Sequence, residues 1–401
     1  MSPDIKTRVK ELEEELIALR RDFHMHPELG LEEHRTAGIV ETYLENLGLE
    51  VSRMCGTGVI GILKGGQPGK TLMLRADIDA LPIDEMTDHE FKSLNPGVMH
   101  ACGHDGHTSM MMIAAKILTE YRASLKGTIK FVFQPNEENA CAADMVKEGV
   151  LQNPSVDAVV GTHLMTSIPT GNVSADDGPV MAESNVFKLT LTGKGGHTAM
   201  PDESIDPIVT AANIIQQIQT IQAREISSHK PTAIVFGSIK AGTIANIIPE
   251  TVELEGTIRC LYDSRKEPGE TLCEKFERII KHVCAANRTE YELEYTFINP
   301  PVVNDPDVTA VVRETAAQVV EGTDKKVVPY VTMIGEDFGE FTQDVPGTFF
   351  FVGVGNKEKK TDFPHHHPRF DIDEDGLAIG VEMHVTSAIN YLNGQMRNDL
   401  G

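Results

Sequence analysis

The stretch from Met99 to His107 concentrates residues that can bind a metal ion. Five of its nine side chains carry lone pairs that could bind a cation, and small residues separate them. Cys102 and His104 are two positions apart, so on an extended loop both could bind one ion or two adjacent ions. Thiolate, imidazole and carboxylate together suit Zn²⁺, and oxygen donors with water also suit Mn²⁺ or Co²⁺. Two other interpretations stay open: a buried cysteine beside a loop histidine, and a cysteine nucleophile activated by histidine.

Acidic and imidazole side chains follow three expected buried strands. The strands 71–76, 128–133 and 158–161 precede Asp77 with Asp79, Glu137 with Glu138, and His163, respectively. Ligands of open α/β sheets bind just past the carboxyl ends of the strands. Of the adjacent glutamates, one could bind metal while the other takes a proton from water. A solvated surface pair is the alternative for these two residues.

Further candidates lie later in the chain. His365-His366-His367 is enclosed by two prolines, which favours a rigid ligand loop over a tag-like tract. The glycines before His197 allow close backbone approach and could present this histidine to a substrate, or they could form a simple turn. Asn246 raises the same question as His197, and Arg259, near the end of an expected strand, could bind a carboxylate bidentately. Arg259 could equally pair with one of the many acidic side chains.

Hydrophobic periodicity predicts the elements that must position these residues. Short apolar strands alternate with helices expected near 9–23, 32–47, 109–121 and 142–148, which is typical of a mostly parallel α/β sheet flanked by helices. From about residue 183 the pattern changes to half-exposed strands at 186–192, 232–239, 251–258 and 291–297, with helices near 206–223 and 270–286. Pro300-Pro301 ends this part. Helix and strand signals then resume at 307–320, 348–352 and 376–391.

These patterns predict an α/β protein of two domains. Residues 1–182 and 299–401 form a discontinuous domain around the central sheet, and residues 183–298 form a smaller inserted α+β domain. A chain of 401 residues is too long for one compact core, which agrees with this division.

Charge and cysteine usage limit the functional classes. The 36 Lys and Arg against 60 Asp and Glu give a net charge of -24, which argues against nucleic acid or an anionic membrane as partner. The six cysteines show no paired framework, so we expect reduced thiols. Met1 to Arg21 contains no apolar signal region, and no run of eighteen apolar residues occurs. We therefore expect a cytoplasmic enzyme of small molecules.

Several motifs together resemble one known family. The sequence is similar to the di-metal amidohydrolases, which include aminoacylases, hippurate hydrolases, N-acetyl-diaminopimelate deacetylases and plant auxin-conjugate hydrolases, and which are related to metal carboxypeptidases. The motifs follow the family order over almost the whole chain and are His24-x-His26-Pro27-Glu28, Arg75-Ala76-Asp77-x-Asp79, His100-Ala101-Cys102-Gly103-His104-Asp105, Gln134-Pro135-x-Glu137-Glu138, Gly195-Gly196-His197 and Glu336-Asp337-Phe338.

The resemblance implies roles for individual residues. It implies one or two divalent ions per subunit, with Cys102 as a bridge if there are two, and with the metal ligands Cys102, His104, Glu138, His163 and His366. His366 is chosen over His367 because it matches the family spacing to the following proline. Glu137 is implied as general base and His197 as a residue that polarises the scissile carbonyl, often in the partner subunit. Supporting roles are implied for Asp79 and Asp105, which would hold ligands in place, and for Asn246 and Arg259, which would bind substrate.

The resemblance also implies an activity and an assembly. The inserted domain would close over the substrate and mediate a homodimer or tetramer. The reaction expected first is hydrolysis of an N-acyl amino acid to a carboxylate and a free amino acid. A dipeptidase or small metallocarboxypeptidase would use the same centre, and a catalytically silent sensor remains an alternative. One departure concerns Asn139-Ala140-Cys141-Ala142-Ala143, which stands where relatives have a glycine-rich stretch and puts the shape of the acyl pocket in doubt.

Overall fold

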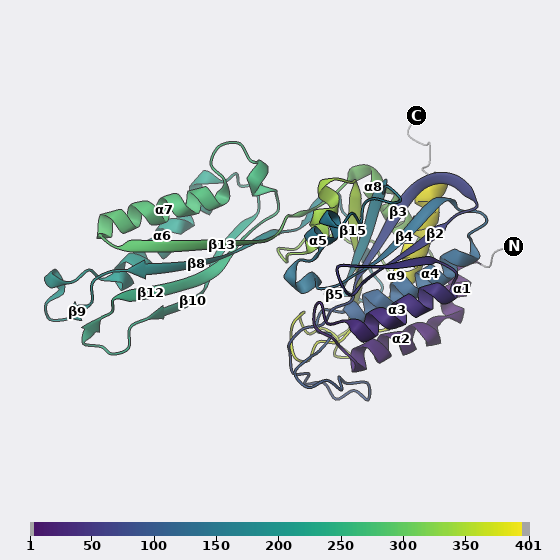
Figure 1. Ribbon diagram of the computed structural model, residues 1–401, viewed down its shortest axis with the longest axis horizontal. Helices are drawn as coiled ribbons and strands as arrows, with labels where there is room; N and C mark the ends of the chain where they lie inside the picture. Colours follow the sequence, from purple (N-terminus) through teal and green to yellow (C-terminus); the bar gives the residue numbers. More distant parts are fainter. Residues whose placement is uncertain (1–3, 395–401) are drawn as a thin grey trace. The chain divides into compact units, whose positions relative to one another are not determined.

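The structure, a computed structural model, describes residues 4–394, and these fold as two compact units (Figure 1). Unit 1 contains the chain up to Val180, Val303–Val331 and the chain from Asp337 onward. Unit 2 contains Met181–Val302 and Thr332–Glu336. The domain boundaries expected from the sequence, after residues 182 and 298, lie within a few residues of the observed boundaries after Val180 and Val302. The return of Thr332–Glu336 to unit 2 was not expected. The expected first domain also included 1–3 and 395–401, which lie outside the described residues.

A seven-stranded sheet lies at the centre of unit 1, in the order β1-β2-β4-β3-β5-β15-β6. Neighbouring strands among β4, β3, β5 and β15 are parallel, whereas β1, β2 and β6 run antiparallel to their neighbours. The strands are β1 Glu50–Met54, β2 Gly58–Lys64, β3 Gln67–Asp77, β4 Lys126–Gln134, β5 Ala158–Pro169, β6 Val173–Ser174 and β15 Gly347–Gly355. The α/β class with a mostly parallel central sheet is thereby confirmed.

Helices flank this sheet (Figure 1). They are α1 Ile5–Glu11, α2 Glu13–Met25, α3 His34–Asn46, α4 His104–Glu120, α5 Ala142–Lys147, α8 Pro306–Val320 and α9 Asp375–Asn393, with short helices η1 Glu137–Asn139 and η5 Asp337–Gln343. The prediction of a single helix over residues 9–23 is wrong, because the helix is interrupted at Leu12 and a second helix begins at Glu13. Glu13, Glu14 and Glu15 occupy the first turn of α2, where acidic side chains favour a new helix start.

Helix α4 is the element that the functional residues depend on most. It is buried over most of its length, with methionine, isoleucine and alanine side chains packed into the core. It contacts α2, α9 and β3. The Thr108 hydroxyl donates to the carbonyl of Asp77 at 3.0 Å, which ties the first turns of α4 to the carboxyl end of β3. This contact fixes where His104, the first residue of α4, lies.

Unit 2 is built around an antiparallel sheet of order β10-β12-β8-β13. Phe187, Leu189 and Leu191 alternate along β8 and form a core with α6 and α7, which cover one face of the sheet (Figure 1). The elements are β8 Glu183–Thr192, β9 Gly196–His197, η2 Pro201–Glu203, α6 Pro207–Thr220, η3 Ile221–Glu225, β10 Thr232–Ala241, β11 Ile247–Ile248, β12 Thr251–Cys260, η4 Ser264–Lys266, α7 Leu272–Asn287 and β13 Glu290–Asn299. Strands β9 and β11 form a small separate sheet, as do β7 Gly178–Met181 and β14 Val302–Asn304.

Between residues 4 and 394, no helix combines the length and the apolar character that crossing a membrane requires.

Candidate metal centre

The predicted ligands of unit 1 come from elements that meet at the carboxyl edge of the parallel strands. Cys102 and His104 lie at the start of α4, Glu137 and Glu138 lie in η1 directly after β4, and His163 lies on β5. The expectation that His163 follows a strand is wrong. Strand β5 continues to Pro169, because β15 pairs with it as far as that residue, although polar side chains such as Thr162 and His163 interrupt its apolar run. An apolar run therefore marked only the first part of this strand.

Three buried side chains form the first ligand group. The Sγ of Cys102 and ring nitrogens of His104 and His163 all lie within 4.8 Å of one another, and Cys102 Sγ is 3.5 Å from His163 Nε2. His104 Nδ1 contacts the backbone oxygen of Asp79 at 3.0 Å and its Oδ1 at 3.2 Å. His163 Nδ1 contacts the carbonyl oxygen of Leu164 at 2.8 Å. Both imidazoles are thus held so that Nε2 faces the cluster, as second contacts orient histidine ligands in metal proteins.

A second group shares Cys102 with the first. Cys102, Glu138 and His366 also offer ligand atoms within 4.8 Å of one another. His366 Nε2 lies 3.3 Å from Glu138 Oε1. The backbone N–H of Glu138 donates to Asp79 Oδ2 at 3.1 Å, so the Asp79 carboxylate contacts both His104 and Glu138. The shared thiolate gives the two groups the composition of a two-ion site with one bridging ligand.

The chemistry of these donors fits divalent metal. Among the described residues, the buried atoms His104 Nε2 and Glu138 Oε1 form no hydrogen bond, although Glu138 Oε1 lies 3.3 Å from His366 Nε2. Buried polar atoms are rarely left unpaired, so each such atom needs an explanation, and an ion is one. A third group of close ligand atoms consists of His104, Glu137 and Glu138, and Glu137 Oε2 lies 3.9 Å from His104 Nε2. Glu137 therefore lies at the edge of the cluster, where a general base is needed.

The three histidines of the 365–367 tract have different contacts. His365 Nε2 contacts the carbonyl oxygen of Leu164 at 2.9 Å. His367 Nδ1 accepts from the backbone N–H of Arg369 at 3.0 Å. His366, at φ +63°, is the one that approaches Glu138, and its own N–H donates to the carbonyl of Ala101 at 2.8 Å. The positive φ turns this side chain toward the cluster.

Two buried residues beside the ligands, Asp77 and His107, were candidates by position but received no individual role from the family resemblance. Asp77 Oδ1 contacts His107 Nδ1 at 2.6 Å, and its Oδ2 accepts from Arg75 Nη1 at 2.7 Å. His107 Nε2 accepts from the N–H of Leu164 at 2.9 Å. The position of Asp77 at the end of a strand and the spacing of His107 three residues after His104 were the available signals. Their contacts connect α4, β3 and β5 next to the ligand cluster.

Charge determines the protonation of these imidazoles. Burial alone would raise the pKa of the Asp77 carboxyl, but the neighbouring His104, His107 and Arg75 hold it well below its usual range. Burial opposes a charged His104, yet Asp77 and Asp79 raise the pKa of this imidazole to about 10. Burial and the nearby His107 lower the pKa of His163 well below its ordinary value. His163 is therefore neutral and ready to bind metal, whereas a metal ion would displace a proton from His104.

Asp105, expected to hold a ligand in place, belongs to a buried ion-pair cluster. Its Oδ2 accepts from Arg20 Nε at 2.9 Å and contacts His24 Nδ1 at 2.7 Å. Arg20 also donates to Asp371 Oδ1 at 2.7 Å. Burial alone would raise the pKa of Asp105, but the Arg20 charge and the contact with His24 hold it far below its usual range. These contacts attach the residue after His104 to helix α2, so Asp105 supports the position of α4.

The candidate residues of unit 2 lie at two ends of its sheet. Exposed His197 pairs with Ile247, and the N–H of Thr198 donates to the carbonyl of Asn246 at 3.3 Å, which brings His197 and Asn246 into one region. Arg259 lies near the far end of β12, where its Nη1 donates to the carbonyl of Met333 at 3.1 Å. Eight residues of strand separate the start of β12 from Arg259, which corresponds to about 26 Å. The structure does not bring Arg259 together with the other two.

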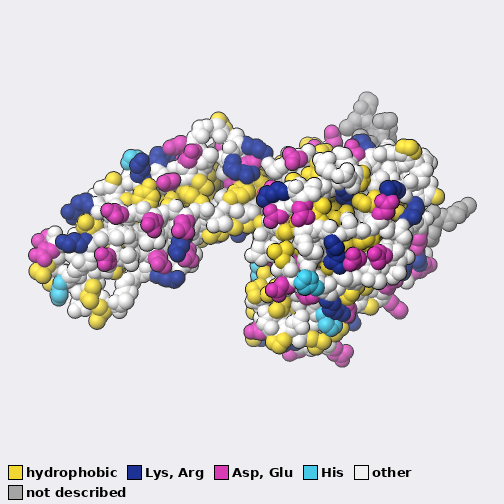
Figure 2. All heavy atoms as spheres, viewed as in Figure 1, with side chains coloured by type: hydrophobic (Ala, Val, Ile, Leu, Met, Phe, Trp, Pro, Cys, Tyr) yellow, Lys and Arg dark blue, Asp and Glu magenta, His cyan; other side chains and the backbone are white. Residues whose placement is uncertain are grey.

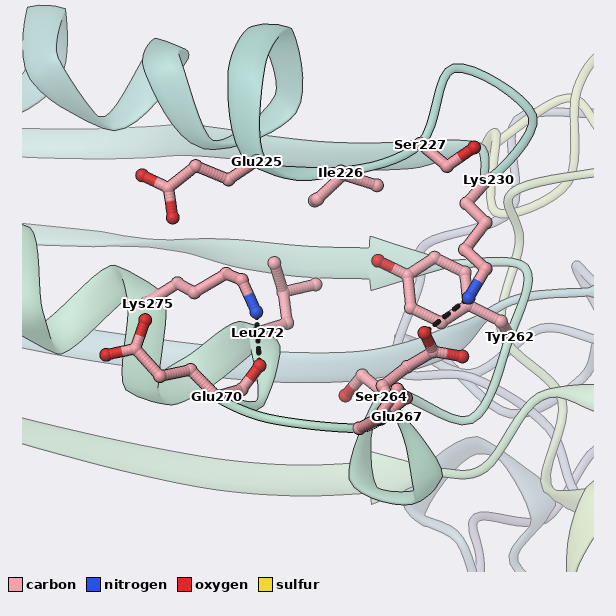
Figure 3. Close-up of a pocket in the computed structure, with 11 residues that line it drawn as sticks. Glu225, Ile226, Ser227, Lys230, Tyr262, Ser264, Glu267, Glu270, Leu272 and Lys275 are labelled. Atoms are coloured by element: carbon pink, nitrogen blue, oxygen red, sulfur yellow. Dashed lines mark hydrogen bonds and ion pairs between the residues drawn. The ribbon is translucent and has the colours of Figure 1, made fainter.

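Unit 2 also contains a cavity of about 200 Å³ that is lined by none of the predicted site residues (Figure 3). Lys230 forms an ion pair with Glu267 there and lies 5.2 Å from the ring centroid of Tyr262. The Lys275 ammonium donates to the carbonyl of Glu270. The lysines at this cavity are thus already paired within unit 2.

Comparison with known proteins agrees with this geometry. The sequence pattern of peptidase family M20/M25/M40 matches residues 73–390. The chain belongs to this family. It is 38% identical to Thermostable carboxypeptidase 1 of Saccharolobus solfataricus over 97% of this chain and 98% of the relative. It is 36% identical to N-acetylcysteine deacetylase of Bacillus subtilis, over 94% of this chain and 97% of that protein.

A solved structure of the M20 family supports the fold and the kind of centre. The Bacillus subtilis YXEP protein, described as a dinuclear metal-binding peptidase, matches with a TM-score of 0.80 and 33% identity over 96% of this chain and 99% of that chain. The resemblance to di-metal amidohydrolases and metal carboxypeptidases is thereby confirmed. This M20 chain is a metal-dependent hydrolase.

Proposed function

We propose that this M20 hydrolase cleaves the amide bond of N-acyl amino acids and releases a carboxylate and a free amino acid. The observation that carries the proposal is the cluster of buried Cys102, His104 and His163 with half-buried Glu138 and exposed His366, and with Glu137 at its edge. The deacetylase relative, whose name describes removal of an acyl group from an amino acid, supports this substrate class.

The cluster would hold one or two divalent ions. Cys102, His104 and His163 would bind one ion, and Cys102, Glu138 and His366 would bind the other, so that Cys102 bridges. Zn²⁺ or Mn²⁺, and also Co²⁺, suit a mixture of thiolate, imidazole and carboxylate. Asp79 would orient ligands of both ions.

The protein groups have separate tasks in the reaction. Divalent ions, when bound, lower the pKa of water and polarise a carbonyl. Glu137 takes the proton of the attacking water and returns it to the leaving nitrogen. His197 donates to the oxygen on which negative charge develops. Asn246 and Arg259 bind the carboxylate of the substrate, with Arg259 as the bidentate donor.

Unit 2 would close over the substrate and mediate a homodimer or tetramer. One small substrate cannot contact both ends of the unit 2 sheet, because these ends lie about 26 Å apart. We infer that His197 and Asn246 serve the centre of the partner subunit.

The expected partners follow from the surface. Acidic and basic side chains are mixed over the face shown in Figure 2, and the net charge is -24. Such a surface offers little attraction to phosphate groups. We therefore propose a cytoplasmic enzyme of small molecules that uses neither nucleic acid nor membrane as partner.

A second activity is supported by the 38% identical relative named as a carboxypeptidase. The same metal cluster and the same general base could hydrolyse the peptide bond of a dipeptide or the last bond of a short peptide. The two activities differ in the substrate's α-amine. An N-acyl amino acid has its α-amine blocked by the acyl group, whereas a dipeptide has a free α-amine.

Amine release from a small panel distinguishes these activities. Chelator-stripped protein is re-supplied with Zn²⁺, Mn²⁺ or Co²⁺ and tested on N-acetyl, N-benzoyl and longer N-acyl amino acids and on dipeptides. We expect metal-dependent release from at least one N-acyl substrate. Release from dipeptides alone would replace the proposal by the peptidase activity, and absence of release from the whole panel would contradict both.

A further inference from the structure

A second cavity of unit 2, of about 470 Å³, lies beside the two residues of this region that are proposed to contact the substrate. Its walls include Thr198, which follows His197, and Ala245 and Ile247, which flank Asn246. The N–H of Thr198 donates to the carbonyl of Asn246 at 3.3 Å, and His197 pairs with Ile247 across β9 and β11. Sites for small ligands commonly have volumes of about 300 to 1,000 Å³, so this cavity is large enough for part of a substrate.

Most of the residues that line this cavity are apolar. Ile208, near the start of α6, is 41% exposed, and Ile244 and Ile247, between β10 and β12, are 58% and 52% exposed. Ile248 and Pro249 also line it. Exposed apolar side chains that occur singly are common on protein surfaces, whereas a group of them around one hollow indicates a place where an apolar group binds.

One acidic residue, Asp206, lies in the wall of the cavity. Its Oδ1 accepts from the N–H of Ile208 at 2.8 Å, so this carboxylate caps α6 and is fixed in position. A second negative charge placed beside it would be repelled. The cavity therefore suits a neutral apolar group better than an acidic one.

The ring of His197 is oriented by its own turn. The N–H of Ala199 donates to His197 Nδ1 at 3.0 Å, so the proton of the neutral ring lies on Nε2. Nε2 is then the atom that donates to a carbonyl oxygen, as the proposed role of His197 requires. A substrate with its scissile carbonyl at His197 and its carboxylate at Asn246 has its Cα between these two residues.

We propose that this cavity binds the amino-acid side chain of the substrate and selects N-acyl amino acids with apolar side chains. The inference rests on the proposed function, because the roles of His197 and Asn246 define where the substrate lies. The Cα is bonded directly to the carboxylate that Asn246 binds, and the residues on both sides of Asn246 line the cavity. The side chain on Cα therefore enters the cavity, whereas the acyl group extends from the other side of the scissile carbonyl. The cavity serves the same active centre as His197 and Asn246.

Hydrolysis of N-acetyl-leucine and N-acetyl-alanine by the metal-loaded, full-length protein tests this assignment. We expect kcat/KM to be roughly tenfold or more higher for the leucine substrate, because one methylene in an apolar pocket changes discrimination about 10- to 200-fold. Ile244→Ser should lower this ratio roughly tenfold. Ile239→Ser is the matched control, because Ile239 is a 53% exposed isoleucine of β10 that does not line the cavity, and its ratio should equal that of the wild type.

Three results would overturn the assignment while the proposed function stands. The first is a wild-type ratio near one, or a ratio that Ile244→Ser leaves unchanged. The second is a change in Ile244→Ser that follows the length of the acyl chain, compared between N-acetyl-alanine and N-hexanoyl-alanine, since the cavity would then bind the acyl group. The third is an equal loss for both N-acetyl substrates together with a changed oligomeric state in light scattering, which would make the cavity a contact between subunits.

Binding without turnover separates this inference from the proposed function. Hydrolysis of no N-acyl substrate would contradict the proposed function, and calorimetry on metal-loaded Glu137→Gln then tests the cavity directly. We expect N-acetyl-leucine to bind roughly tenfold more tightly than N-acetyl-alanine, and Ile244→Ser in the Glu137→Gln background to remove this difference. Equal dissociation constants for the two compounds, or a difference that persists in the double variant, would refute the apolar side-chain site.

Discussion

The ligand cluster of unit 1 and the candidate substrate residues of unit 2 are organised in opposite ways. In unit 1, side chains from four separate chain segments place ligand atoms within 4.8 Å of one another in groups of three. The Asp79 carboxylate contacts the His104 ring and the backbone N–H of Glu138. In unit 2, His197 is exposed and Arg259 lies about 26 Å along the sheet from the end where His197 lies. The comparison shows that unit 1 brings its candidate ligands together within one chain, whereas unit 2 does not bring its candidate substrate residues together.

The largest expected effect concerns the general base. Glu137→Gln keeps the shape of the side chain and removes its basicity, so turnover should fall by roughly 10²- to 10⁴-fold. Metal content should remain that of the wild type, because Glu137 is not among the proposed ligands. Turnover and metal content measured on the same samples check this. Glu358→Gln, at an exposed glutamate of unit 1, is the control, and a near wild-type rate for Glu137→Gln would contradict the assignment.

The buried ion pairs that hold α4 in place can be removed without changing any proposed metal ligand or the general base. Arg20→Met leaves the buried carboxylates of Asp105 and Asp371 without their shared counterion. Loss of one partner of a buried ion pair costs about 3 to 5 kcal/mol in the free energy of unfolding. Arg53→Met breaks a partly exposed pair with Glu41 and should cost at most about 1 kcal/mol. Urea unfolding of both variants measures the difference, and equal losses would show that the buried cluster gives no special support.

The role of unit 2 is tested by His197→Ala. Loss of one donor to a developing oxyanion costs roughly 10²- to 10³-fold in turnover. Metal content should be unchanged, and His229→Ala, at another exposed histidine of unit 2, should retain turnover. If the partner subunit supplies His197, mixing His197→Ala with Glu137→Gln and allowing subunits to exchange should restore activity. Absence of any recovery despite subunit exchange would place His197 at the centre of its own chain or outside the reaction.

A smaller effect is expected from Asp79→Asn. Replacement of a group that orients metal ligands costs about 10- to 100-fold in metal affinity. Asp84→Asn, at an exposed position after β3, is the matched control. Metal dissociation constants of the two variants should therefore differ, and equal values would show that the contacts of Asp79 with His104 and Glu138 do not orient these ligands.

Local sequence signals predicted the fold class and the elements that carry the cluster. The apolar runs of β3 and β4 were visible, since buried strands need continuous hydrophobic residues. Strand β1, Glu50–Met54, was missed because most of its side chains are exposed or half-buried and do not alternate. The end of β5 was missed because buried polar residues such as Thr162 and His163 interrupt the apolar pattern.

The candidate ligands were found through their chemistry and their family resemblance, and their roles remain predictions. The supporting contacts could not be read from the sequence. Arg20 and Asp105 are 85 positions apart, and no local periodicity links them. His107 likewise becomes a neighbour of Asp77 only when β3 and α4 pack. Such contacts depend on tertiary structure, which a single sequence does not display.

The most direct test of the central claim is a calorimetric titration of chelator-stripped protein with Zn²⁺. If Cys102 bridges two ion sites, the wild type should bind two ions per chain, and His366→Ala should retain one tight site, formed by Cys102, His104 and His163. Two tight ions in His366→Ala, or no tight binding by the wild type, would contradict the proposed centre.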